Sequence, residues 1–581
     1  MKNKLYAKFL PDEKATVISL ELGDLSTHGE NSGKANHVSE CSLPSVAHET
    51  KAEMGDRSTF DSNLGLVFSC LGSAVGTGNI WRFPRILATN SSSKGSLAFY
   101  VAWVILLFCW SIPVILLEYT LGRFTRNSVP VAFNKFLGKY SVWIGGWLVT
   151  SVFFLSCYYP VIIGWCFYYL YISIALKELP ATEEAGEAIF NDFTENPYLP
   201  VILQIAAVFL TGVFLFGGIN WIERANMILV PLLLCIVIFT FGWSLTRAYA
   251  EVGIVFLFTP NWSSLADSSL WIAAASQNAF DTGAGMALLM TYAIYVGRDA
   301  KVVHYSALIP MTNNLVSFYA SITLFSTVFS TMVMDNPTLT RSAIVKIIQT
   351  TGPGSTGLTF TWIPVLFSKV GVFGRVLCSL FFLCLSFAGI SSLIAEVQVY
   401  IVTIKDLGFS HKFAVAISIF GCVAMGIPSA MSLQFLENQD NTWGYALIIS
   451  GLLLCLIPIF YGPLRFRRIV VNIPGVNDWR VPLFWVPIIT FLVPLQAVTL
   501  IGWWIYHSIK TDPIWYHIKF TSVTTTLIEW AIVVLLLLIA NLIAVRVKGD
   551  RLFEKAKQYG CDPYDPSTYE DSQTTEEHPS I

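Results

Sequence analysis

Two apolar segments of the chain each carry closely spaced glycines beside polar residues. One reads Gly72-Ser73-Ala74-Val75-Gly76-Thr77-Gly78-Asn79, and the other reads Phe280-Asp281-Thr282-Gly283-Ala284-Gly285. Glycine is a poor helix former, and unwound backbone at membrane depth is tolerated only where it lines a cavity. Freed carbonyls there coordinate a cation, and half-helix N-termini attract an anion. The pattern predicts a shared site for a cation and a zwitterionic solute; the alternative is glycines that only let helices pack closely.

Several polar residues stand inside apolar segments, where charge is costly and a function is the default. Asp281 lies at the second glycine break, with structural pairing as its alternative role. Asn79 and Asn313 are neutral oxygen donors of the kind that sodium prefers, or they tie helices together. Ser392 and Glu396 share one helical face. A seam of small packing residues would explain the serine, but it does not explain the carboxylate.

The composition indicates that a bilayer is the main solvent of the chain. Of its 581 residues, 54% are hydrophobic and 13% are charged, and the mean hydropathy is +0.60. The net charge of −2 provides no basic field for binding nucleic acid. The apolar segments contain no nucleophile–base pair or metal cluster, so we do not expect an enzyme.

About twelve apolar segments are long enough to cross a bilayer. They lie near 64–88, 97–122, 142–173, 200–217, 222–248, 269–297, 302–332, 373–404, 411–430, 443–462, 482–508 and 523–546. The two glycine breaks fall in the first spans of two five-span units and, being an odd number of spans apart, run in opposite directions. The sequence therefore predicts an all-α integral membrane protein with 12 transmembrane helices, a 5+5 inverted repeat and broken helices 1 and 6.

Hydrophilic segments flank the apolar part of the chain. Residues 1–60 carry mixed charge and lack the apolar core of a signal peptide, and residues 547–581 turn acidic. We expect a mostly disordered N-terminal tail, a transporter domain at 61–546 and a C-terminal tail with little fixed structure. The stretch 333–372 is long and less apolar, which is typical of a functional loop such as an extracellular lid.

The charges of the short loops predict the orientation. Loops 122–141 and 462–480 are rich in arginine and lysine, whereas 175–199 has six acids against one lysine. Basic loops stay in the cytoplasm, and both basic loops lie on the side of the tails. We therefore expect a multi-pass protein of the plasma membrane with both termini cytoplasmic.

One string of residues matches a known family closely. The run Gly76-Thr77-Gly78-Asn79-Ile80-Trp81-Arg82-Phe83-Pro84 resembles the first-helix signature of the neurotransmitter:sodium symporters, which have the LeuT-like fold. The stretches 259–277 and 387–392 and the pair Tyr158-Tyr159 fit as well, so the resemblance covers about 60–546. The short loop 175–199, without a cysteine pair, is similar to the bacterial-type branch of amino-acid transporters. The resemblance implies sodium-coupled import of an amino acid or similar small carboxylate-bearing amine by alternating access.

The same resemblance implies roles for particular residues. One sodium is expected on the carbonyls of Gly72, Val75 and Ala388 and the hydroxyls of Ser391 and Ser392. A second is expected on the Ala74 carbonyl, Asn79, Asn313 and Asp281. The substrate pocket is expected to comprise Ala74, Gly76, Gly78, Tyr159, Phe280, Gly283, Met286, Ser392 and Glu396. Arg82 with Asp440 would form the outer gate, and Arg57 with Asp406 the inner gate.

Departures from the family pattern refine these expectations. Asp281 stands where Thr or Ser is usual, and Trp103 replaces a tyrosine that binds chloride in chloride-dependent members. We expect the carboxylate to supply the negative charge, so that chloride is not required. Gly76 replaces the aspartate of monoamine carriers, which favours a substrate that brings its own carboxylate; the alternative is that Asp281 or Glu396 substitutes for that aspartate. Glu396 beside the small Gly283 favours a substrate side chain with a hydrogen-bond donor or a positive charge.

Two other functions stay open on the sequence. A proton-coupled amino-acid transporter would use Asp281 and Glu396 as proton carriers, and a non-transporting amino-acid sensor would keep the pocket without moving solute. The residues expected at both gates favour transport. The expected partners are a small amino-acid substrate and membrane lipid.

Overall fold

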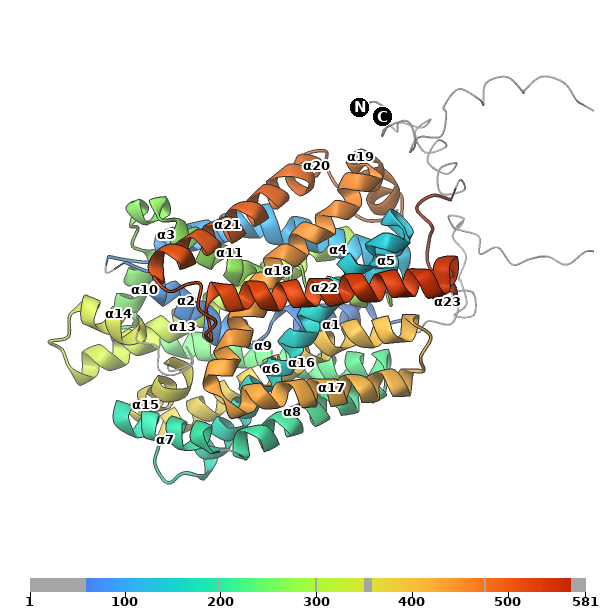
Figure 1. The fold of residues 1–581 in the computed structure, drawn as a ribbon. Coiled ribbons are helices and arrows are strands. Elements are labelled where there is room, and N and C mark those ends of the chain that lie inside the picture. The colour runs from blue at the N-terminus through green and yellow to red at the C-terminus, as the bar shows by residue number, and fades with distance from the viewer. Residues whose placement is uncertain are drawn as a thin grey trace, which may run out of the picture. The chain divides into compact units, whose positions relative to one another are not determined.

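The computed structural model describes residues 59–92, 94–196, 198–297, 300–349, 358–474 and 477–565. Within these ranges the secondary structure is helical, without a strand (Figure 1). Ten described helical segments are long and apolar enough to cross a membrane. They are α3–α4 (Leu97–Thr125), α6 (Val142–Ala175), α8 (Leu199–Phe216), α9 (Ile219–Leu245), α13 (Val302–Asp335), α16 (Val372–Asp406), α17 (His411–Met431), α18 (Leu433–Tyr461), α20–α21 (Trp485–Thr511) and α22 (Val523–Lys548).

Two further spans are broken at the positions that the glycines predict. In the first, α1 (Asn63–Ala74) meets the segment Gly78–Thr89, which comprises the π-helical turn η2 and α2, at a bend of 48°. In the sixth, α11 (Ser268–Thr282) and α12 (Leu288–Ala293) are separated by five non-helical residues. Together with the ten continuous spans they complete the predicted twelve-helix arrangement, with a broken helix at the head of each five-span unit.

Glycine is required at the break in the sixth span. Gly285 has φ +96°, and a Cβ there would lie 2.6 Å from the Leu447 carbonyl oxygen of α18. Its amide donates a 2.7 Å hydrogen bond to Glu118 Oε1 of α4. A buried carboxylate of the second span thus replaces the helical partner that the unwound backbone has lost.

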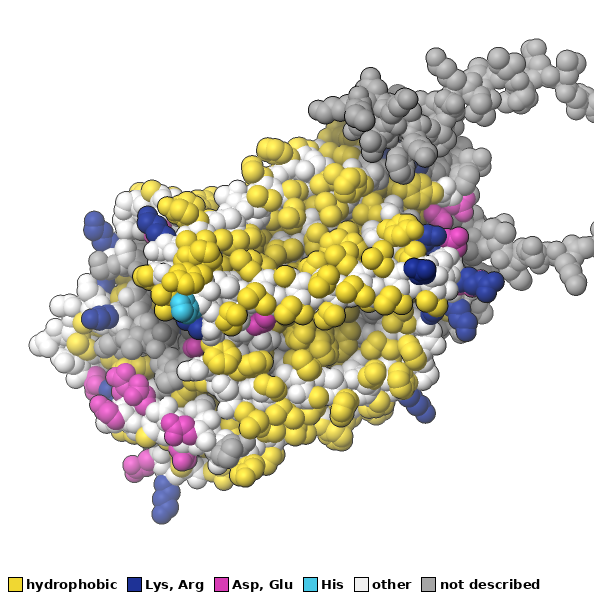
Figure 2. Space-filling view, in the orientation of Figure 1, with side chains coloured by type: hydrophobic (Ala, Val, Ile, Leu, Met, Phe, Trp, Pro, Cys, Tyr) yellow, Lys and Arg dark blue, Asp and Glu magenta, His cyan; other side chains and the backbone are white. Residues whose placement is uncertain are grey.

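Short helices and charged side chains gather at the two ends of the bundle. Figure 1 shows α7 (Glu183–Glu195) and α14 (Arg341–Gln349) at one end, and α5 (Val129–Leu137) and α23 (Glu554–Lys557) at the other. We call these the α7 end and the α5 end. In Figure 2 hydrophobic side chains cover the surface between them, as expected for helices that face lipid.

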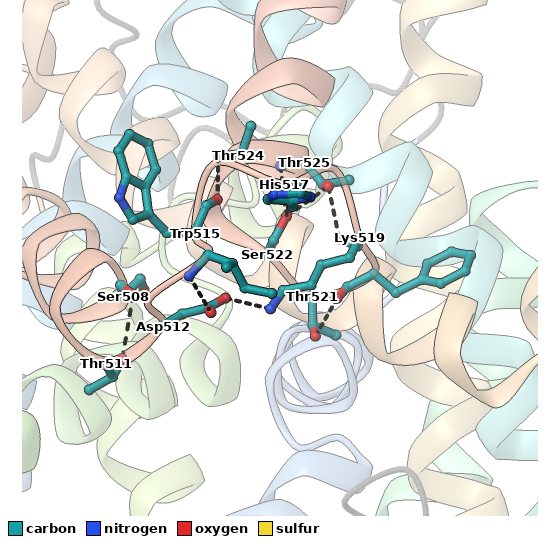
Figure 3. A network of polar contacts seen from close by, with 12 residues as sticks. Ser508, Thr511, Asp512, Trp515, His517, Lys519, Thr521, Ser522, Thr524 and Thr525 are labelled. Carbon is teal, nitrogen blue, oxygen red and sulfur yellow. Dashed lines mark hydrogen bonds and ion pairs between the residues drawn. The ribbon is translucent and has the colours of Figure 1, made fainter.

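The connection between α21 (Val493–Thr511) and α22 forms its own polar network (Figure 3). Asp512 Oδ2 and Lys519 Nζ form a 2.6 Å ion pair. The hydrogen bond from Lys519 lowers the pKa of Asp512. Ser522 Oγ donates to the His517 carbonyl oxygen at 3.1 Å, so the loop is held by its own side chains.

Three features differ from the expectations. The tenth span begins at Leu433 rather than near 443, because the polar residues before 443 face a cavity and are still helical. A short helix, α10 (Ala250–Phe258), occupies a segment for which we expected no element. The loop 333–372 contains α14 and α15 (Ile363–Ser368), while its Gly-Pro stretch at 352–354 lies outside the described residues.

The first part of the C-terminal tail is folded, unlike the loose tail that its composition predicts. Leu552, Phe553 and Ala556 pack on Val131 of α5. The Cys561 amide donates to the Phe124 carbonyl oxygen at 2.9 Å. Apolar residues spaced through a charged segment explain the difference, since they cover the α5 end of the bundle.

Candidate functional site

The break in the first span is held by side chains from spans 1 and 3. The α1 helix ends at Ala74, and Asn79 folds back so that its Oδ1 accepts a 2.9 Å bond from the Gly76 amide. The Thr77 amide and hydroxyl donate to Tyr159 OH of α6 at 3.1 and 2.9 Å. Tyr159 and Asn79 therefore fix the unwound backbone from two sides.

Three oxygen atoms face one another where the two broken helices meet α13. Asn313 Oδ1 accepts a 2.8 Å bond from Asn79 Nδ2. The same Asn313 atom lies 2.9 Å from the Ala74 carbonyl oxygen and 3.2 Å from the Asp281 carbonyl oxygen. Rotating the amide would let nitrogen donate to both carbonyls, whereas the orientation with oxygen inward is satisfied by a cation among the three acceptors.

This arrangement brings together all four residues expected at the second sodium site. Each is almost completely buried, with 0 to 4% of its surface exposed. Neutral carbonyl and amide oxygens are ligands of hard monovalent cations, and the unwound backbone provides them without losing helical hydrogen bonds. The chemistry of the donor set therefore fits sodium.

The residues expected at the other sodium site also lie together. Ser392 Oγ of α16 donates to the Gly72 carbonyl oxygen at 3.1 Å. Ser391 Oγ donates to the Ala388 carbonyl oxygen at 3.0 Å. Val75, the remaining member, is the buried residue that follows α1. The serine hydroxyls thus donate to the carbonyl oxygens of Gly72 and Ala388, and a cation would be coordinated by these hydroxyl and carbonyl oxygens together.

Asp281 has two neutral hydrogen-bond donors. Gln277 Nε2 donates to its Oδ1 at 2.5 Å, and Ser317 Oγ donates to its Oδ2 at 3.2 Å. The residue is 2% exposed. A carboxylate therefore occupies the space between the Gln277 amide and the Ser317 hydroxyl.

The expected solute pocket borders both breaks. A Cβ on Gly76 would lie 2.9 Å from Ser392 Oγ and 3.2 Å from Tyr159 OH, so these hydroxyls bound the space beside the glycine. A Cβ on Gly78 would lie 3.0 Å from the Phe280 ring. Glycine at 76 and 78 therefore lets Ser392, Tyr159 and Phe280 approach the unwound backbone closely.

Three more of the expected pocket residues lie on spans 6 and 8. Met286 Sδ lies 3.8 Å from the Cβ that Gly283 lacks. Glu396 follows Ser392 by one turn of α16, and its Oε2 has no hydrogen-bond partner.

A cavity of about 300 Å³ lies between spans 1, 3, 6, 10 and 11, and the expected pocket residues Tyr159 and Phe280 are among its lining residues. Arg82 and Asp440, the expected outer gate, both line it but form no ion pair among the described residues. The Arg82 guanidinium instead lies 4.1 Å over the Phe280 ring, and Asp440 Oδ1 accepts from Tyr158 OH at 3.0 Å. The two gate residues therefore have separate partners, and the cavity between them is not closed by their pairing.

The expected inner gate is only partly described. Arg57 lies outside the described residues. Asp406 Oδ2 accepts from the Ser128 amide at 2.8 Å, beside α5. Gln398 Nε2 donates to Tyr295 OH at 3.1 Å, and the Tyr295 carbonyl oxygen accepts from the Phe60 amide at 3.1 Å. These bonds tie the start of the first span to spans 6 and 8.

One residue of this end was missed by the sequence analysis. Glu223 of α9 accepts three hydrogen bonds from the residues before α1. Its Oε2 binds the Asp61 amide at 2.7 Å, and its Oε1 binds the Ser62 amide at 3.0 Å and the Ser62 hydroxyl at 2.8 Å. A lone acid near the start of an apolar span was the available signal.

Comparisons with known proteins agree with this geometry. The model of the sodium:neurotransmitter symporter family matches residues 57–196 and 195–549. An uncharacterised sodium-dependent transporter of Methanocaldococcus jannaschii is 30% identical over 444 residues, covering 74% of this chain and 87% of that protein. A sodium-dependent nutrient amino acid transporter of Drosophila virilis is 23% identical over 577 residues, covering 88% of this chain and 87% of that protein. The crystal structure of MhsT in complex with L-phenylalanine superposes with a TM-score of 0.65 at 26% identity, covering 77% of this chain and 99% of that one.

Proposed function

Because the chain belongs to the sodium:neurotransmitter symporter family, we propose that it imports an amino acid or a similar small carboxylate-bearing amine together with sodium, by alternating access. The family and the relatives are sodium-dependent transporters and not enzymes. The observation that carries the proposal is that the Ala74 and Asp281 carbonyl oxygens lie 2.9 and 3.2 Å from one end of the Asn313 amide, where the two broken helices meet α13. With the amide oxygen turned inward, a cation at that point would be coordinated by all three groups.

Two sodium ions bind in this proposal. One uses Ala74, Asn79, Asn313 and the Asp281 carbonyl, and the other uses Gly72, Val75, Ala388, Ser391 and Ser392. Each ion that moves inward through a potential of ~100 mV releases about 2.3 kcal/mol, in addition to its concentration gradient. Two ions therefore supply enough free energy to concentrate a solute substantially.

The solute lies between the two breaks. Its carboxylate binds the sodium that Asn79 and Asn313 hold, the backbone amide near Gly78 and the Tyr159 hydroxyl. Its amine binds the carbonyl oxygens of Ala74 and Phe280. Gly76 supports a substrate that carries its own carboxylate, since no acid stands there to bind a bare amine. The Phe280 ring lies under the Arg82 guanidinium, and both residues line the cavity between spans 1, 3, 6, 10 and 11.

Chloride is not required in this proposal. The Asp281 carboxylate lies between Gln277 and Ser317, and it provides the negative charge that balances the nearby sodium. A second anion at the same point would be repelled by the carboxylate.

Alternating access would open the site first to one end of the bundle and then to the other. Pairing of Arg82 with Asp440 would close the α7 end, and release of the bonds around Tyr295 and Glu223 would open the α5 end. We place the protein in the lipid of the plasma membrane. Its α7 end faces outward, and both termini lie in the cytoplasm.

Uptake into proteoliposomes tests the proposal. A pool of labelled amino acids is offered under an inward sodium gradient, or under an inward proton gradient without sodium. We expect uptake only with sodium. Uptake driven by protons alone would transfer the coupling to the buried carboxylates, and binding without uptake under either gradient would identify a sensor.

A further inference from the structure

Among the described residues, Glu396 is a carboxylate of the membrane interior without a hydrogen-bond or ion-pair partner. Glu396 is 6% exposed, its Oε2 has no hydrogen-bond donor, and no ion pair joins it to any described residue. The other buried acids of the site have donors, as Asp281 does from Gln277 and Ser317. A buried charge without a partner is expensive, so a bound cation is the group that Glu396 lacks.

The position of Glu396 places this missing group in the solute pocket. It follows Ser392 by one turn of α16, and Ser392 Oγ borders the space beside Gly76. Helical side chains lean toward the N-terminus, so Glu396 covers the turn that carries Ser392. It also lies within electrostatic range of Tyr159, which borders the same space.

The spacing fits a side chain of particular length. One helical turn advances about 5–6 Å, and a stem of three or four carbons ending in a cation spans a distance of that order. The small Gly283 and the flexible Met286, both expected in the same pocket, would adapt to such a stem.

We propose that Glu396 pairs with a positively charged group at the end of the substrate side chain, so that the transported solutes are dibasic amino acids of the lysine, ornithine and arginine type. The inference rests on the proposed function, because it assumes that the α-carboxylate and α-amine lie at the two breaks. It explains both the unpartnered carboxylate and its place in the pocket, since the charge is neutralised only when the correct solute binds.

L-lysine and L-norleucine provide the test, because they have the same chain length and differ in the terminal ammonium. Sodium-driven uptake of each is measured in proteoliposomes with the wild-type protein, with Glu396→Gln and with the control Glu529→Gln. Glu529 is a half-buried membrane carboxylate bonded to Asn438 and Gln439, and it is not among the residues expected in the pocket. We expect kcat/KM for lysine to exceed that for norleucine at least ~10-fold in the wild type, and E396Q alone to lose that ratio.

A binding measurement keeps the test valid if E396Q transports poorly. In detergent with sodium, L-lysine should raise the Tm of the wild type and of E529Q but not that of E396Q, while sodium alone should still raise the Tm of E396Q. A wild-type preference for norleucine, or an unchanged lysine preference in E396Q, would overturn the inference and leave sodium symport intact. If pH shifts the uptake of both solutes equally in the wild type and not in E396Q, Glu396 carries a proton instead. No sodium-driven uptake of any amino acid would refute the proposed function itself.

Discussion

Gln277 Nε2 donates a 2.5 Å hydrogen bond to Asp281 Oδ1, one helical turn further along α11 and next to the break in the sixth span. The bond holds the carboxylate toward α13, where Ser317 Oγ provides the second donor. It therefore fixes a carboxyl group beside the Asn313 amide and the carbonyl groups of Ala74 and Asp281 itself. This group and the proposed sodium ligand at 281 thus lie on the same short segment of backbone.

Replacing this carboxylate should make transport depend on chloride. In Asp281→Ser the donors from Gln277 and Ser317 would face a gap that a chloride ion can fill, as they do in chloride-dependent members of the family. We expect uptake by D281S to fall at least ~5-fold when chloride is replaced by gluconate, and wild-type uptake to change little. Initial rates in proteoliposomes measure both.

Asp267 provides the control on the same helix, because it caps the start of α11 through the Ser269 amide and does not enter the site. Asp267→Asn should respond to chloride as the wild type does. Wild-type uptake that collapses in gluconate would show that the carboxylate does not take the place of chloride.

Asn313→Ala should weaken sodium binding. The substitution removes the oxygen that lies 2.9 Å from the Ala74 carbonyl and the acceptor for Asn79 Nδ2. We expect the sodium concentration for half-maximal uptake to rise at least ~10-fold, equivalent to about 1.4 kcal/mol. Asn541→Ala, which removes a bond from α22 to the Tyr140 carbonyl, should leave it unchanged. Equal sodium curves for both variants would exclude Asn313 as a ligand.

The sequence alone predicted the two helix breaks of the candidate site, because the signal for them is local. Glycine clusters mark both breaks, and Asn79, Asn313 and Asp281 are polar residues whose presence in apolar segments needs a function. Ser392 and Glu396 were placed on one face by helical spacing alone, and the structure has them on consecutive turns of α16.

What the sequence could not predict depends on contacts between distant segments. The partner of Arg82 is the Phe280 ring rather than Asp440, a choice that depends on how closely spans 1 and 10 approach. The predicted start of the tenth span lies too far along the chain, because hydropathy assigns Asp440 and its polar neighbours to a loop, although they are helical and line a cavity. The folded C-terminal segment has a composition typical of tails, and only its packing on Val131 shows its position.

Gly285→Ala should destabilise the fold and stop transport. A methyl group at φ +96° would be strained, and it would lie 2.6 Å from the Leu447 carbonyl oxygen. We expect the free energy of unfolding to fall by about 1–3 kcal/mol, seen as a lower Tm. Uptake by the protein that remains folded should also fall, because Glu118 loses its alignment with the Gly285 amide. Gly502→Ala is the matched control, since a Cβ there meets no atom within 4 Å. A wild-type Tm for G285A would show that the break adapts to a side chain.

Glu223→Ala should loosen the start of the first span. The variant removes the acceptor of the Asp61 and Ser62 amides and of the Ser62 hydroxyl, so the N-terminal end of α1 would separate from α9 more often. Hydrogen–deuterium exchange over residues 61–66 should quicken at least ~10-fold in E223A, because an amide exchanges only when its bond opens. Glu251→Ala, on the exposed side of α10, should leave that segment unchanged. Slow exchange in both variants would mean that the bonds around Tyr295 hold this end closed without Glu223. Fast exchange in E223A alone would assign to this one carboxylate the contact that must break before the α5 end opens.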